Sequence, residues 1–121
     1  MANYQSPPPD QLILHRQSKT LELAYGNDVY HLTAEYLRVS SPSAEVQGHG
    51  PDQAVLQLGK EDVGIEQLEP IGHYAVKIYF DDGHNSGLFT WDYLYTLAVE
   101  QSQRWQAYLD KVETAGYQRR V

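Results

Sequence analysis

The sequence predicts an α+β fold: an antiparallel β-sheet of roughly five to seven short strands, with short helices on one side and an amphipathic helix at the C-terminus. Between residues 11 and 90, short segments of alternating apolar and polar residues are separated by turn residues, as in antiparallel hairpins. From Trp91 onward, apolar residues recur every third or fourth position, which is the period of a helix buried on one face. A chain of 121 residues has the size of one domain.

Strands are expected in several short segments: residues 11–16, 20–25, 29–32, 54–58, 63–68, 74–80 and 88–90. The strongest pattern is Tyr74–Phe80, where bulky apolar residues alternate with smaller or charged ones. Turn residues at 26–28 and 81–87 predict two hairpins. Pro70 is expected to end the strand that precedes it, because proline cannot donate a backbone hydrogen bond.

Helices are expected after the first and second hairpins. Thr33 can cap a short helix with its hydroxyl, and this helix should end before Pro42, because a residue preceding proline avoids helical geometry. One further helical turn is expected at residues 44–47. The C-terminal helix is expected over about residues 91–115. A break at residues 101–103 is left open, since that stretch is polar all round.

Two six-residue segments resemble each other, Leu32–Leu37 and Phe89–Leu94. Each has a threonine, an acidic residue two positions later and then a Tyr-Leu pair, which predicts a strand that leads into a capped helix. A structural repeat and a chance likeness are both compatible with the sequence.

The chain is expected to form one domain with a short tail at each end. Residues 1–10 are expected to be disordered, because the prolines at positions 7–9 favour an extended chain. Residues 11–116 are expected to be globular, with Gly116 ending the last helix. Residues 117–121 are expected to be a frayed, locally basic tail.

Composition excludes several classes of function. The chain has no cysteine, which excludes disulfides, thiolate metal sites and cysteine nucleophiles. Its net charge of −7 repels phosphates, so we expect no nucleic-acid partner. We also expect no membrane partner and a cytoplasmic location, because no apolar run approaches the ~18 residues of a membrane span and residues 1–15 lack a signal peptide's pattern.

Two longer runs carry a family resemblance: Glu35–Gly50 (EYLRVSSPSAEVQGHG) and Gly72–Leu94 (GHYAVKIYFDDGHNSGLFTWDYL). Both resemble the small stand-alone bacterial proteins grouped with the N-terminal domain of gamma-butyrobetaine hydroxylase, a domain of unknown function. The resemblance covers roughly residues 12–97. It implies a β-rich fold with short helices and, since similar domains also end some iron–sulfur carrier ATPases, an accessory role.

The resemblance also bears on metals. The resemblance implies that the corresponding domain of the hydroxylases holds a structural zinc through three cysteines and a histidine. In those enzymes, this domain precedes a separate iron- and oxoglutarate-dependent catalytic domain. The cysteine positions correspond here to Ser41, Ser43 and Val46, and the histidine to His84. Serine is a poor zinc ligand, so we expect this zinc site to be absent. We also expect no oxygenase activity, since this chain leaves no room for the second domain.

The histidines divide into two groups. His49 and His84 lie in glycine-containing loops and are candidates to bind a divalent metal, with help from Asp81, Asp82 or Glu45. No closely spaced histidine pair supports this, so the interpretation as exposed or turn-bonding histidines is favoured. His31 and His73 are expected to be structural, and His15 is expected at the surface.

The leading hypothesis is a non-catalytic accessory module that binds an unknown protein partner through loops near residues 38–49 and 81–87. The expected binding surface comprises Arg38, Ser41, Ser43, Glu45, His49, Asp82 and His84. Arg38 is expected to bind an acidic partner or, as the favoured alternative, to pair with Glu35 or Glu45.

The second hypothesis is an accessory protein that binds iron or zinc through the loop histidines, and the third is a small enzyme of unknown class. No catalytic residue is assigned, because neither a nucleophile elbow nor a phosphate-binding loop occurs in the sequence. For the same reason we predict no cofactor under the leading hypothesis.

Overall fold

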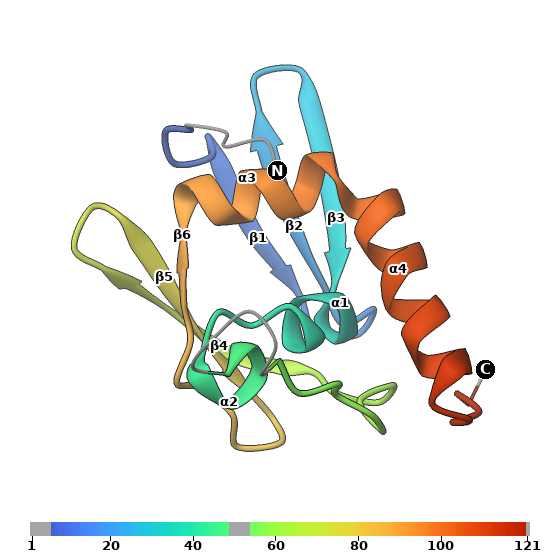
Figure 1. The fold of residues 1–121 in the computed structure, drawn as a ribbon. Helices are drawn as coiled ribbons and strands as arrows, with labels where there is room; N and C mark the ends of the chain where they lie inside the picture. The colour runs from blue at the N-terminus through green and yellow to red at the C-terminus, as the bar shows by residue number, and fades with distance from the viewer. Residues whose placement is uncertain (1–5, 49–53, 121) are drawn as a thin grey trace.

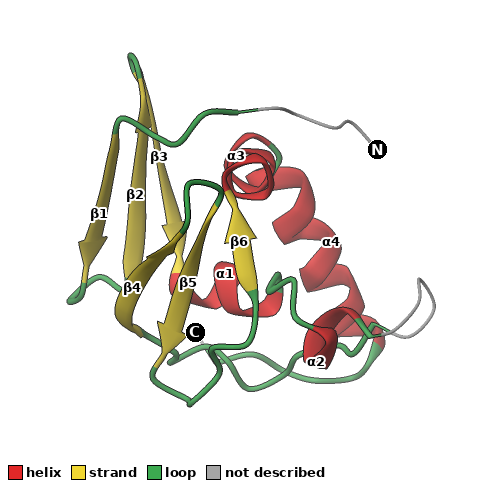
Figure 2. Ribbon diagram, turned by 90° about the vertical axis from the view of Figure 1, so that its left-hand side faces the viewer, coloured by secondary structure: helices red, strands yellow, loops and turns green. Residues whose placement is uncertain are grey.

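Antiparallel pairing builds two three-stranded sheets (Figures 1 and 2). The computed structural model describes residues 6–48 and 54–120. Sheet A contains β1 (Gln11–His15), β2 (Thr20–Tyr25) and β3 (Asp28–Thr33), in that order. Sheet B contains β4 (Ile65–Ile71), β5 (Ala75–Phe80) and β6 (Leu88–Thr90). The α+β class is confirmed, but the expected single sheet is wrong. The chain leaves each sheet through its third strand directly into a helix.

Helices α1 (Ala34–Val39), α2 (Ala44–Gln47), α3 (Trp91–Val99) and α4 (Gln101–Thr114) complete the described chain. They lie on one side of the strands, as the sequence predicted (Figure 2). The C-terminal helix does break, at Glu100 rather than at 101–103. The Glu100 carboxylate accepts a hydrogen bond from Arg104 and so supports the first turn of α4. No helix in the described part of the chain has the length and apolar character that crossing a membrane requires.

The two similar six-residue segments form equivalent structures. Thr33 caps α1 by accepting a hydrogen bond from the Tyr36 N–H at 3.0 Å. Thr90 caps α3 in the same way, accepting from the Tyr93 N–H at 3.1 Å. Each helix therefore follows the third strand of its sheet, and the structure contains the same strand-to-helix unit twice.

The tyrosines of these two units hold the helices together. The Tyr36 hydroxyl donates to the Leu97 carbonyl in α3 at 2.8 Å. The Tyr93 hydroxyl donates to the Ser40 carbonyl at the end of α1 at 2.6 Å. Each tyrosine thus satisfies a carbonyl near the end of the other helix, where intrahelical partners are missing. These bonds fix the end of α1, where the candidate site begins.

The main core lies between the two sheets and the helices. In β2, Leu21 and Leu23 are fully buried, and the intervening Glu22 points to the opposite face. The other buried members of the core are Leu32, Ala34, Tyr36, Leu37, Val63, Ile65, Val76, Ile78, Phe80, Phe89, Leu94, Leu97 and Ala98. Sheet A therefore has a core-facing side and an outer side.

Two strand predictions are wrong, namely the end of β4 and the strand expected at residues 54–58. Strand β4 continues through Pro70 to Ile71, because β4 is an edge strand whose proline needs no partner on its open side. Residues 54–58 form no strand. Their backbone is bonded instead to neighbouring elements: the Val55 N–H donates to the Val46 carbonyl, and the Gln57 carbonyl accepts from the Tyr108 hydroxyl.

The segments expected as tails contact the domain where they are described. Asp10 bonds to the β2–β3 hairpin, donating its N–H to the Ala24 carbonyl and accepting from the Gly26 N–H. After α4, Arg119 pairs with Glu35 and lies over the Trp105 ring. Each described end of the chain is therefore tied to the domain by at least one residue, Asp10 at one end and Arg119 at the other. Residues 1–5 and 121 lie outside the described residues.

Candidate functional site

Two segments that are distant in the sequence meet and supply the candidate site. One is the α1–α2 connection with its flanking turns, residues 38–47, and the other is the β5–β6 loop, residues 81–87. Helix α1 ends before Pro42, as expected. Ser43 is the N-terminal cap residue of α2, yet its hydroxyl makes no capping bond and is directed to the β5–β6 loop instead.

His84 is the centre of this site. Its side chain is 3% exposed, and both ring nitrogens have partners. Nε2 lies 2.9 Å from Ser41 Oγ and 3.3 Å from Ser43 Oγ, while Nδ1 lies 3.1 Å from a Glu45 carboxylate oxygen. A neutral imidazole satisfies this network when Nδ1–H donates to Glu45 and Nε2 accepts from the Ser41 hydroxyl. We call this group of four residues the Ser-His clasp, because it ties the two segments together.

A second set of bonds reinforces the clasp through Asp82. The Asp82 carboxylate accepts from the His84 N–H at 3.1 Å, from Arg38 at 2.8 Å and from Lys60 at 3.1 Å. Burial acts to raise the pKa of Asp82, but these three donors outweigh it and hold the pKa below its ordinary value of 3.8. Asp82 therefore remains ionised and keeps Arg38 in place.

The surroundings of His84 favour its neutral form. Burial lowers the pKa of His84 most, and the positive charge of Arg38 lowers it further. Glu45 and Asp82 act in the opposite direction without cancelling these effects. The pKa of His84 consequently lies below its ordinary value of 6.5.

Acidification is expected to destabilise the protein through this histidine. A lowered folded-state pKa means that the unfolded chain binds the proton more readily. The contribution of His84 is therefore fully present above about pH 6.5 and decreases as the pH falls towards the folded-state pKa. Urea denaturation at several pH values should show this decrease for the wild-type chain. In His84→Gln, which does not titrate, the decrease in that window should be smaller, and equal pH profiles would contradict the prediction.

The clasp has the residue types of a hydrolase triad, because Ser41 bonds to His84 and His84 bonds in turn to the Glu45 carboxylate. Its geometry does not suit nucleophilic catalysis, because Ser41 is fully buried and its Oγ is enclosed by the clasp itself. A nucleophile must reach the substrate carbonyl while bonded to its base. The arrangement is suited instead to holding two loops in a fixed relation.

The clasp residues do not fit the zinc that the family resemblance implies. Ser41, Ser43 and His84 do converge, but neutral hydroxyls bind zinc poorly. Val46 is buried and has no donor atom. Both nitrogens of His84 are already engaged in hydrogen bonds. The structure therefore places a hydrogen-bonded network at the positions that correspond to the metal ligands.

The structure brings together six of the seven residues expected in the binding surface: Arg38, Ser41, Ser43, Glu45, Asp82 and His84. The seventh, His49, lies outside the described residues, so its proposed partnership with His84 stays a prediction. Arg38, Ser41, Ser43 and His84 are buried. Glu45, by contrast, remains largely exposed.

The favoured prediction for Arg38, an ion pair with Glu35 or Glu45, is wrong. Arg38 pairs with Asp82, from the β5–β6 loop, and donates to Gln57 rather than bonding to Glu35 or Glu45. Glu35 pairs with Arg119 near the end of the chain. Both outcomes depend on residues far away in the sequence.

Sequence reasoning also missed Gly87. A Cβ atom at this position would lie 2.4 Å from Ser41 Oγ and 3.1 Å from the Ser43 backbone nitrogen. Glycine thus allows the β5–β6 loop to approach the serines closely enough for the clasp to form. The sequence offered a signal, the glycine after Ser86, but did not show which atoms it approaches.

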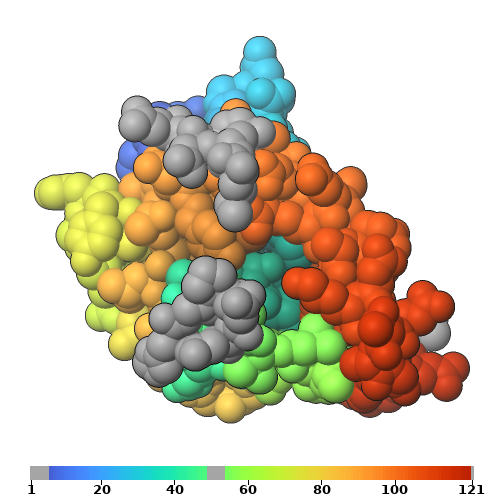
Figure 3. Space-filling view, viewed as in Figure 1, coloured from blue at the N-terminus to red at the C-terminus, as the bar shows by residue number. Residues whose placement is uncertain are grey.

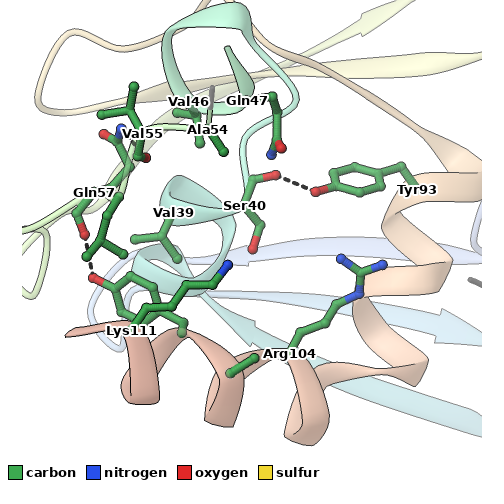
Figure 4. A pocket seen from close by; sticks show the side chains of 13 residues that line it. Val39, Ser40, Val46, Gln47, Ala54, Val55, Gln57, Tyr93, Arg104 and Lys111 are labelled. Carbon is green, nitrogen blue, oxygen red and sulfur yellow. Dashed lines mark hydrogen bonds between the residues drawn. The ribbon is translucent and has the colours of Figure 1, made fainter. Parts of the chain in front are cut away.

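An open groove lies beside the clasp, with a cavity volume of about 400 Å³ (Figures 3 and 4). One wall is α4 and the other is formed by the α1–α2 region and residues 54–57. Apolar side chains line part of it, including Val39, Val46 and Val55. Arg104 and Lys111 extend from α4 along the opposite wall (Figure 4). The groove therefore combines an apolar surface with positive charge, in a chain whose net charge is −7.

Comparisons with known proteins agree with the sequence resemblance. The family model described as "Gamma-butyrobetaine hydroxylase-like, N-terminal" matches residues 12–95. No curated protein matches the chain. The chain is similar to an NMR solution structure at 57% identity and a TM-score of 0.83, covering 95% of this chain and 91% of that one. A second NMR solution structure has 42% identity and a TM-score of 0.80, covering 98% and 89%.

A crystal structure from Acidithiobacillus ferrooxidans is also similar, with 35% identity and a TM-score of 0.62 over 78% of this chain and 98% of that one. That protein is described as having unknown function and belonging to the DUF971 family. The structural similarity therefore covers nearly the whole of that protein, in addition to the residues that the family model matches.

Proposed function

Since this chain belongs to the gamma-butyrobetaine hydroxylase-like N-terminal domain family, we propose that it is a non-catalytic accessory module that binds a partner protein in the groove beside α4. The groove is the observation that carries the proposal. It offers apolar contacts and the cationic side chain of Lys111, beside an Arg104 already paired with Glu100, on a scaffold whose buried serine is unsuited to catalysis.

The chemistry of the groove defines the occupant as a short acidic segment that carries an aliphatic side chain. Val39 and Val55 can contact the aliphatic group, since Val39 is half-buried and Val55 is 55% exposed. Lys111 is exposed and supplies positive charge across the groove. Opposite charges favour encounter and orientation of a peptide, while the apolar contact supplies affinity.

The Ser-His clasp supports this proposal by fixing the wall that the peptide would contact. It anchors residues 41–45 to the β5–β6 loop from behind, so that Val39 and Val46 keep their places in the groove. A binding surface with fixed walls loses less conformational entropy when its ligand binds. The buried members of the sequence-predicted surface thereby contribute by positioning rather than by contact.

Panning a phage-displayed random peptide library on the protein tests the proposal. We expect enrichment of peptides that combine acidic residues with an aliphatic one. A synthetic copy of an enriched peptide should bind Lys111→Glu about tenfold more weakly in fluorescence anisotropy, because the variant replaces attraction by repulsion.

Lys77→Glu is the matched control. It makes the same change of charge in β5, away from the groove-lining residues, and should leave the peptide affinity within about twofold. The proposal is wrong if no peptide is enriched, or if both charge reversals weaken binding equally.

A further inference from the structure

Three potential metal ligands meet on the outer side of sheet A. His15 in β1, Glu22 in β2 and His31 in β3 each offer one ligand atom, and these atoms all lie within 4.8 Å of one another. Among residues 6–48 and 54–120, no other group of three histidine, aspartate or glutamate side chains has this spacing. The group lies apart from the Ser-His clasp and from the residues that line the groove.

Strand register explains why these side chains meet. Glu22 lies directly opposite His31 in the β2–β3 pair. In the β1–β2 pair, Glu22 lies opposite Ile13, so His15 is its diagonal neighbour, two residues further along β1. All three side chains point to the same face because Glu22 alternates with the buried Leu21 and Leu23.

The distances suit a divalent transition metal. With bonds of 2.0–2.1 Å to nitrogen and oxygen, tetrahedral zinc holds its ligand atoms about 3.3 Å apart. His31 Nε2 lies 3.3 Å from Glu22 Oε1, and His15 Nε2 lies 2.8 Å from the same oxygen. The second distance is a hydrogen bond, and a small rotation of the half-exposed His15 ring opens it to the metal spacing.

We propose that His15, Glu22 and His31 bind a divalent transition-metal ion, zinc in preference to magnesium, on the outer face of sheet A. Two imidazoles and one carboxylate form a donor set that suits zinc, whereas magnesium requires mainly oxygen ligands. Three protein ligands leave a coordination position for water. This assignment corrects the expectation that His31 is a structural imidazole, since its side chain is 57% exposed.

The scaffold holds these ligands in fixed positions and leaves them accessible. Glu22 is on the central strand, paired on both sides, and its side chain is 19% exposed. Helix α4 anchors the backbone of His31, whose carbonyl accepts a hydrogen bond from the Gln101 side chain at 3.1 Å. The outer face of sheet A points away from the helices (Figure 2), so an ion can approach from solvent.

Titration of tag-free protein with zinc chloride at about pH 7.5 tests the proposal. Isothermal titration calorimetry should give close to one ion per chain, and histidine side-chain NMR signals should shift for His15 and His31. Magnesium chloride should produce neither effect. His31→Ala and Glu22→Gln should each weaken zinc binding by at least about tenfold. Both substitutions are on a solvent-facing side of the sheet, and the thermal midpoint without metal should confirm that they fold.

His73→Ala is the matched control, because His73 is exposed and lies outside the group. It should bind zinc as the wild-type chain does. The proposal is overturned if His31→Ala binds zinc with wild-type affinity, or if the shifted signals belong to His49 or His84. It is independent of peptide binding in the groove, so either result can fail without the other.

Discussion

Replacing His84 by alanine is expected to lower the free energy of unfolding by about 2–4 kcal/mol. The change removes a buried ring and leaves the Ser41 and Ser43 hydroxyls without their imidazole partner. A buried polar group that loses its hydrogen-bond partner lowers the stability of the fold, because it no longer has the bonds to water that it would make in the unfolded chain. The decrease should appear as a lower urea midpoint with little change in slope.

The control for this substitution is His73→Ala. His73 is exposed, and its backbone carbonyl, which accepts from Trp91, is retained in the variant. Its stability should remain within about 0.5 kcal/mol of the wild-type value. If His84→Ala were no less stable than His73→Ala, the clasp would not be the structural tie that its geometry indicates.

Adding a single methyl group at Gly87 is expected to have an effect of comparable size. In Gly87→Ala, the new Cβ would lie 2.4 Å from Ser41 Oγ, so either the loop or the buried serine must move. The same Cβ would also lie 3.1 Å from the Ser43 backbone nitrogen, so backbone as well as side-chain atoms crowd it. We expect a loss of about 1–3 kcal/mol in the free energy of unfolding, the usual cost of overpacking.

A double-mutant cycle distinguishes this mechanism from a general loss of loop stability. Gly87→Ala and His84→Ala disturb the same contact, so their combined effect should be smaller than the sum of the single effects. Ser86→Ala, at the exposed preceding residue, should change stability little. Additive losses in the double variant would show that Gly87 acts independently of the clasp.

The elements that the sequence predicted best are those fixed by nearby residues. The caps at Thr33 and Thr90 each depend on an N–H only three residues away, so the repeated pattern could be recognised directly. The hairpin at residues 26–28 is similarly local. Pro70 misled the prediction, because its effect depends on whether its strand lies at the edge of a sheet.

The candidate site was predictable as a set of residues and less so as an arrangement. Polar residues in two glycine-containing loops pointed to residues 38–49 and 81–87, and the described members of that set do meet. The sequence did not show that Ser41 and His84, 43 residues apart, would be buried against each other. The sequence therefore suggested an exposed surface at positions where the structure has a buried hydrogen-bond network.

The sequence by itself determined the α+β class, the positions of most turns and caps, and the absence of cysteine thiol chemistry, since each follows from residue types and their local periodicity. Only the tertiary structure decided that the strands divide into two sheets, that α4 forms a groove wall, and that His15, Glu22 and His31 share one face. The physical reason is register: a shift of one residue in strand pairing would turn Glu22 towards the core, and alternation alone does not reveal which strands pair.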